Sequence, residues 1–214
     1  MKKRFIVILC MTVAVILSSN LTSYGQFALG IRIGYNANKL STDIDTIKSE
    51  FNSGFNASVW AHFGKRLYFA PELRYTLSGG VFTEEGNVST SGWKQKITVG
   101  SMDIPLLLGF KIIHSKAITW RIELGPEMSF VLNEKVKELN DITGPITTSD
   151  INSANWFVMA GTGIDVLFLN FDIRYQYGLN AMIKDVSTST GTLNFNSKNN
   201  LISVSVGFKI FGSK

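Results

Sequence analysis

The chain has 214 residues, one cysteine and a formal net charge of +5. Its length suits a single all-β domain. Removing Lys2, Lys3 and Arg4 from the 21 basic residues leaves 18 against 16 acidic ones, so the chain lacks the basic excess of a nucleic-acid-binding protein and we expect no such partner.

The N-terminal segment has the pattern of a secretory signal peptide. Residues 1–4 carry positive charges, residues 5–17 are almost wholly apolar, and the residues that follow are small and polar. The apolar run is shorter than the roughly 20 residues that a membrane-spanning helix needs. Small residues at the first and third upstream positions favour cleavage after Gly25. We expect 1–25 to be a signal peptide and 26–214 to be one mature domain.

Eight segments then alternate between apolar and other residues with a period of two, which indicates β-strands with two unlike faces. The first four cover 27–36, 55–63, 67–77 and 102–110. Their apolar faces hold Phe27, Leu29, Ile31, Ile33 and Tyr35; Phe55, Ala57, Val59, Ala61 and Phe63; Leu67, Phe69, Pro71, Leu73, Tyr75 and Leu77; and Met102, Ile104, Leu106, Leu108 and Phe110.

Four further strands are predicted over 118–130, 156–166, 171–179 and 202–210. The third and fourth of these alternate clearly: Phe171, Ile173, Tyr175, Tyr177 and Leu179 in one, and Ile202, Val204, Val206, Phe208 and Ile210 in the other. The segment 156–166 alternates least clearly, and we place Gly161, Gly163 and Asp165 on its polar face.

The connections alternate in length as the chain passes from strand to strand. Those over 64–66, 111–117 and 167–170 are short, whereas those over 39–53, 78–95, 133–154 and 180–200 are long and polar. Short turns at one rim and long loops at the other are typical of bacterial outer-membrane barrels. We therefore predict an all-β fold, a transmembrane antiparallel up-and-down β-barrel of about eight strands with both termini periplasmic. A further hairpin within 133–154 would make ten strands.

The composition of the polar face distinguishes a lipid-facing barrel from a soluble one of the lipocalin kind, which turns its polar face to water. This face is built from glycine, serine and charges of both signs, and Lys209 is its only lysine in the central parts of the strands. Charges of both signs can pair across a narrow interior. We predict a structural interior charge network of Arg32, Glu72, Arg74, Asp103, Arg121, Glu123, Glu127, Asp165, Asp172, Arg174 and Lys209.

The apolar face has the features of a lipid belt. Every strand supplies aliphatic residues to it, and aromatic residues such as Phe27, Tyr35, Phe63 and Tyr177 stand toward the strand ends. Aromatic girdles at both interfaces are typical of outer-membrane barrels. We expect outer-membrane lipid to be the partner of this face.

The sequence offers little for catalysis or metal binding. His62 lies on the polar face of the second strand, two pleats from Ser58, but no third group is indicated to orient it. The alternative is that His62 shares hydrogen bonds with interior carboxylates near the short turns. Gly161 and Gly163 lack the following helix of a dinucleotide site, and we interpret them as room for side chains that cross the interior. The only cysteine, Cys10, lies in the predicted signal peptide, and we predict no catalytic residue, metal or cofactor.

Several pieces of the chain resemble the PorT-like, porin-family β-barrel proteins of the outer membrane. They are Leu29–Asn36, Met102–Leu108 (MDIPLLL), Glu123–Glu127 (ELGPE), Phe171–Leu179 (FDIRYQYGL) and Ser205–Phe211. The resemblance covers essentially all of 26–214 and implies the barrel fold and the outer-membrane location. One type of member assists protein secretion.

We interpret the chain as a non-enzymatic outer-membrane barrel with a structural role in the cell envelope or with loops that bind other envelope proteins. Two alternatives stay open on the residues alone. One is a narrow porin for small solutes, which needs a continuous water path between the interior charges. The other is an accessory barrel of a protein-secretion system.

Overall fold

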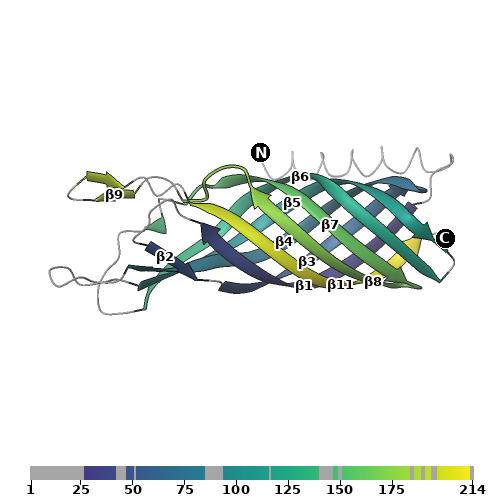
Figure 1. Ribbon diagram of the computed structural model, residues 1–214, viewed down its shortest axis with the longest axis horizontal. Coiled ribbons are helices and arrows are strands. Elements are labelled where there is room, and N and C mark those ends of the chain that lie inside the picture. Colours follow the sequence, from purple (N-terminus) through teal and green to yellow (C-terminus); the bar gives the residue numbers. More distant parts are fainter. Residues whose placement is uncertain are drawn as a thin grey trace, which may run out of the picture.

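A computed structural model of the protein is shown in Figure 1. It describes residues 27–41, 47–50, 52–84, 94–115, 117–139, 147–148, 151–183, 186–188, 191–193 and 197–212. The predicted signal peptide lies outside the described residues. Within them, no helix combines the length and the apolar character required to cross a membrane.

Eight antiparallel strands form a closed barrel. They are β1 (Phe27–Ser41), β3 (Asn52–Gly64), β4 (Leu67–Glu84), β5 (Lys94–His114), β6 (Ile118–Glu138), β7 (Ala154–Val166), β8 (Leu169–Gly178) and β11 (Lys198–Gly212). Each strand pairs with its neighbour along the chain, and β11 pairs with β1, which closes the sheet (Figure 1). Closure leaves no unpaired edge in the membrane interior. The predicted fold class is confirmed.

Three short strands lie at the end of the barrel that carries the long connections (Figure 1). Strand β2 (Ile47–Glu50) pairs with the far end of β4. Strands β9 (Val186–Thr188) and β10 (Gly191–Leu193) form a separate two-stranded hairpin. The barrel closes with eight strands. The β9–β10 hairpin is not the one that was considered within 133–154, a range that the structure describes only in part.

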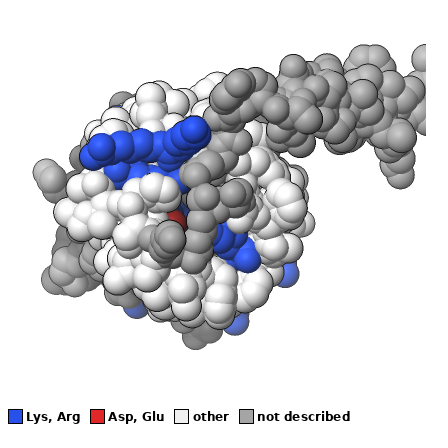
Figure 2. Space-filling model, turned by 90° about the vertical axis from the view of Figure 1, so that its right-hand side faces the viewer, with Lys and Arg blue, Asp and Glu red and all other residues white. Residues whose placement is uncertain are grey.

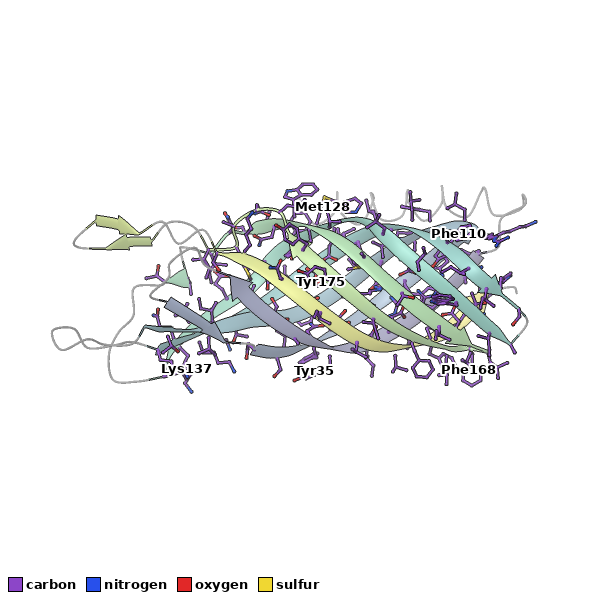
Figure 3. The ribbon with its side chains drawn as sticks, in the orientation of Figure 1. Tyr35, Phe110, Met128, Lys137, Phe168 and Tyr175 are labelled. Carbon is purple, nitrogen blue, oxygen red and sulfur yellow. The ribbon has the colours of Figure 1, made fainter. Side chains whose placement is uncertain are left out.

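The barrel turns its polar face inward and its apolar face outward, as predicted. In β8, Asp172 and Arg174 are buried, whereas Phe171, Ile173 and Tyr175 are exposed by 47%, 57% and 44%. Figure 3 shows Tyr175 on the outer surface of the barrel. A water-soluble barrel has the opposite arrangement. The exterior is thus suited to lipid.

Aromatic side chains gather on the exterior near the short turns. The ring centroids of Phe27 and Phe63 are 5.1 Å apart, and those of Phe27 and Phe211 are 5.9 Å apart. Phe168 and Phe208 form another pair at 5.2 Å. Such a belt is typical of the membrane interface of outer-membrane barrels.

The predicted boundaries of the long loops are wrong, because several strands continue well into them. Strand β5 already begins at Lys94, and β6 reaches Glu138. In this extension the pattern is inverted: Ile97 and Val99 are buried, while Lys96 points to the other face. Beyond the bilayer the outer face of a strand meets water, so its outward residues are polar and its inward residues can be apolar. Because this reverses the pattern of the lipid belt, the segment was predicted to be a polar loop.

Candidate functional site: charged groups in the barrel interior

Charged side chains and small ones occupy alternate strands around the middle of the barrel. Most of the buried charges come from β1, β4, β6 and β8. Strands β3, β7 and β11 lie between three pairs of these strands, and β5, between β4 and β6, contributes Asp103. At most of the paired positions β3, β7 and β11 present Ser58, Gly161, Gly163, Ser203, Ser205 and Gly207. The exception is Trp60 of β3, which pairs with Glu72. Small residues leave the space through which long side chains of second-neighbour strands reach one another.

Gly163 shows how this spacing works. It pairs with Arg121 of β6 on one side and with Asp172 of β8 on the other. A Cβ atom on Gly163 would lie 2.4 Å from Asp172 Oδ1 and 2.8 Å from Arg121 Cζ. Because that atom is absent, Arg121 Nη2 reaches Asp172 Oδ1 at 2.7 Å across β7. This confirms the interpretation of this glycine as room for crossing side chains.

Six of the interior charges form a closed ring in which cations and anions alternate. We call this set the ion-pair ring. Glu72 Oε2 lies 2.7 Å from both Arg32 Nη1 and Arg174 Nη1. Glu123 lies between Arg174 and Arg121, with Oε2 2.8 Å from Arg174 Nη2 and Oε1 2.6 Å from Arg121 Nη1. Asp172 closes the ring, with Oδ1 2.7 Å from Arg121 Nη2 and Oδ2 3.0 Å from Arg32 Nε. None of these six side chains is more than 3% exposed.

The ring satisfies the electrostatic requirement of burial. Removing a charged group from water costs several kcal/mol, and a buried pair offsets this cost only with good geometry. Here three guanidinium groups face three carboxylates, and each group has two partners within the ring. The set is formally neutral, so no member is left as an isolated buried charge.

A second charged cluster lies beside the ring, toward the long loops. Arg74 Nη2 donates to Glu127 Oε2, and Arg74 Nε is 3.4 Å from Asp103 Oδ2. Gln176 Nε2 donates to both carboxylate oxygens of Glu127 at 2.8 Å. Asp103 also accepts hydrogen bonds from hydroxyl groups: Thr76 Oγ1, Ser101 Oγ and Ser129 Oγ. Asp103 and Glu127 share one cation, Arg74, and these hydroxyl and amide groups supply their other hydrogen bonds.

The structure brings most of the predicted charges into these two clusters. Asp165 joins the ring at its edge, because Arg121 Nε lies 3.0 Å from Asp165 Oδ1, but its side chain is 20% exposed. Lys209 does not join: it lines a cavity at the short-turn end and forms no ion pair with the described carboxylates. The alternation placed Lys209 on the correct face, but it gives no position along the barrel axis.

The hydroxyl and amide partners of Asp103 and Glu127 were not predicted. The spacing of these residues could have predicted the contacts. Ser101 lies two residues from Asp103, and Ser129 lies two residues from Glu127. Inward residues two apart on one strand share a face. A buried carboxylate with too few cations calls for such donors.

An aromatic layer separates the ring from the short-turn end. The ring centroids of Trp60 and His62 are 4.3 Å apart, and those of His62 and Tyr68 are 4.6 Å apart. Tyr68 Oη donates to Glu123 Oε1 at 2.8 Å, and Arg32 Cζ lies 5.7 Å from the Trp60 ring. All three aromatic side chains are buried. We call Trp60, His62 and Tyr68 the aromatic layer.

His62 and Ser58 are not hydrogen-bonded to each other in the described structure. His62 Nε2 lies 3.7 Å from Glu123 Oε1 and makes no hydrogen bond, and Ser58 Oγ also has no hydrogen-bond partner within the described structure. The expected hydrogen bonds of His62 to interior carboxylates are therefore not formed at Nε2. Over the described ranges, no group of three His, Cys, Asp or Glu side chains is arranged to hold a metal ion.

Two small cavities lie on opposite sides of the ring. The one toward the long loops measures about 10 Å³ and is lined in part by Thr76, Ser101 and Asp103. The one at the short turns measures about 60 Å³ and is lined in part by His62 and Lys209. They share no lining residue. Charged and aromatic side chains fill the lumen between them.

The chain matches the family model of the outer membrane protein beta-barrel domain over residues 18–184. The chain belongs to this family. Strand β11, which closes the barrel against β1, lies beyond the matched range. Membership of this outer-membrane family and the outward apolar face agree on a location in the bacterial outer membrane.

Several solved structures are similar to the chain at low identity. They include the outer membrane protein OprG from Pseudomonas aeruginosa (TM-score 0.47, 12% identity, covering 87% of this chain and 96% of that one), the attachment invasion locus protein Ail of Yersinia pestis in complex with the heparin analogue sucrose octasulfate (0.44, 13%, 86% and 99%), and Neisserial surface protein A (0.42, 15%, 85% and 97%). No curated protein matches the chain. Similarity at this level assigns no role to the chain.

Proposed function

We propose that this outer-membrane barrel is non-enzymatic and closed to solutes, and that it acts as a structural element of the envelope or through binding by its loops. The ion-pair ring carries this proposal. Its charged side chains cross the lumen from β1, β4, β6 and β8 and engage one another, so they leave the two cavities separate. An eight-stranded barrel is about filled by its own side chains.

The unpaired state of His62 and Ser58 supports the non-enzymatic part of the proposal. A hydrolytic site needs a nucleophile within hydrogen-bond reach of its base. His62 is instead packed between two aromatic rings, Trp60 and Tyr68. Neither His62 Nε2 nor Ser58 Oγ has a hydrogen-bond partner in the described residues, so the two do not form a base–nucleophile pair.

The loop end supports the binding part of the proposal. Strand β2 and the β9–β10 hairpin lie beyond the barrel at that end (Figure 1). Figure 3 also shows Lys137 of β6 at this end, away from the apolar belt. Surface connections on a rigid scaffold are the usual place for binding residues. We propose other envelope proteins as partners of this surface.

We also propose the orientation of the barrel in the membrane, the removal of residues 1–25 and a place among the PorT-like proteins. Short turns are periplasmic in this class of barrel, which supports a periplasmic position for the outer ends of β1 and β11, Phe27 and Gly212. The pattern of residues 1–25 supports export and removal of that segment. The PorT-like label is supported by the pieces Met102–Leu108 and Phe171–Leu179.

Electrical recordings test whether the lumen is closed. We expect the chain, refolded and inserted into planar bilayers, to leave the current at baseline over a range of voltages, because the ring and the aromatic layer fill the lumen. A large porin recorded in the same bilayers controls for insertion and detection. Discrete current steps that grow with salt concentration would identify a water path and replace the closed barrel by the narrow porin.

A further inference from the structure

The cavity at the short-turn end is lined by charged and polar side chains as well as by apolar ones. It measures about 60 Å³ and lies on the short-turn side of the aromatic layer, with Trp60 and His62 among its lining residues. Lys111, Asp165 and Lys209 also line it. A space of this size has room for roughly four waters, or for one tetrahedral oxyanion of similar bulk.

Three buried polar atoms of the lining residues have no hydrogen-bond partner in the described structure. They are Trp60 Nε1, His62 Nε2 and Asn170 Oδ1. The residues that carry them are only 2%, 7% and 2% exposed. Buried polar atoms are almost always hydrogen-bonded, so each unpaired one requires an explanation. A bound group in the adjoining cavity would supply hydrogen-bond partners for Trp60 Nε1 and Asn170 Oδ1, whereas His62 Nε2 lies 3.7 Å from Glu123 Oε1.

The charges around the cavity favour an anion. Neither Lys111 nor Lys209 has a carboxylate of the described residues within ion-pair distance, and Lys111 Nζ lies 5.6 Å from the centroid of the Tyr68 ring. Asp165 is the acidic residue of the lining, but Arg121 Nε and Asn170 Nδ2 already bind its Oδ1 at 3.0 and 2.8 Å. The lining thus holds two lysines, Lys111 and Lys209, against one carboxylate, Asp165, which interacts with Lys111 and also binds Arg121 of the ring.

The rim around the mouth of this cavity is also positively charged. Figure 2, which looks onto the short-turn end, shows lysine and arginine side chains gathered there around a single acidic patch. Lys65 and Arg66 in the first short turn are exposed, and they lie outside the cavity lining. A positive rim raises the local concentration of anions at the mouth of a cavity.

We propose that this cavity binds one phosphate-sized oxyanion. Lys111 and Lys209 act as its counter-ions, Trp60 Nε1 donates to it, and the O–H of a hydrogenphosphate group donates to Asn170 Oδ1. The shared chemistry is a phosphate group, whether of free phosphate or of a lipid headgroup. This site is separate from the ion-pair ring and does not depend on the proposed closure of the lumen.

Calorimetry on the chain refolded in a nonionic detergent tests the proposal, with inorganic phosphate as the titrant. Lys209→Met and Lys111→Met are each expected to weaken binding at least tenfold, because each removes a charge-assisted hydrogen bond. Trp60→Phe keeps the ring and removes the donor, and should weaken binding two- to tenfold. Lys65→Met removes an exposed lysine of the same rim and should change the affinity less than twofold. A shift of the unboiled band on a gel verifies that each variant is folded.

A second titration with a short-chain phosphatidic acid separates the two sources of the phosphate group. Tighter binding than inorganic phosphate, lost in Lys209→Met, would assign the site to a lipid headgroup, and equal or weaker binding would assign it to the free anion. Both results support the site. No heat of binding with either titrant, or an equal loss in Lys65→Met and Lys209→Met, would show that the cavity holds only water.

Discussion

Replacement of Arg174 by methionine is expected to lower the free energy of unfolding by about 3–5 kcal/mol. Arg174 joins Glu72 and Glu123 at 2.7 and 2.8 Å, and its side chain is 3% exposed. Methionine fills similar space without the charge, so the variant leaves a buried ring with two cations and three carboxylates. Urea titration of the barrel folded in lipid vesicles measures the change.

Arg66→Met provides the matched control for this variant. Arg66 is also an arginine of the barrel, but it is exposed and lies over the Phe110 ring at 5.2 Å. Its loss should cost less than about 1 kcal/mol, the range of an exposed cation–π contact. Equal effects of Arg66→Met and Arg174→Met would contradict the account of the ring as a coupled network.

A second large effect is expected on the outer face, where Ile173→Arg should destabilise the barrel by about 2–4 kcal/mol in vesicles. Ile173 is 57% exposed at the centre of β8, directly between the ring residues Asp172 and Arg174. In a bilayer this position faces hydrocarbon, where an arginine is costly. The same urea titration in vesicles measures the loss.

Leu67→Arg is the control for depth. Leu67 is 66% exposed, but it begins β4 beside a short turn, where the membrane interface is expected. Arginine there should cost only about 0–1 kcal/mol. A barrel surrounded by water would tolerate both substitutions, so small and equal effects would count against a lipid-facing exterior.

The sequence predicts the barrel strands well because a lipid belt imposes a strict period of two. β8 shows this most clearly, with inward Asp172 and Arg174 and outward Ile173 and Tyr175. The prediction failed where the strands leave the belt. There the inward residues, such as Ile97, become apolar and the outward ones become polar, so the contrast that marks a strand is reversed and the segment resembles a loop.

The partners within the interior were harder to predict than its members. Arg74 and Asp103 lie opposite each other on neighbouring strands, and such a pair follows from register alone. Arg174 and Glu72 are 102 residues apart, on strands that are not neighbours. Their contact depends on the stagger of the closed barrel, which sets the level of each residue along the axis. Because the sequence does not give this stagger, Lys209 was predicted to belong to the network, although it lies at the short-turn end.

The central claim, a barrel whose apolar face requires lipid, is tested most directly by refolding the chain into detergent micelles and comparing boiled and unboiled samples on a gel, with circular dichroism on the same sample. We expect a β-rich spectrum and a band that shifts on boiling, in detergent only. A chain that is soluble and folded without detergent would contradict the lipid-facing exterior and would indicate a periplasmic barrel instead.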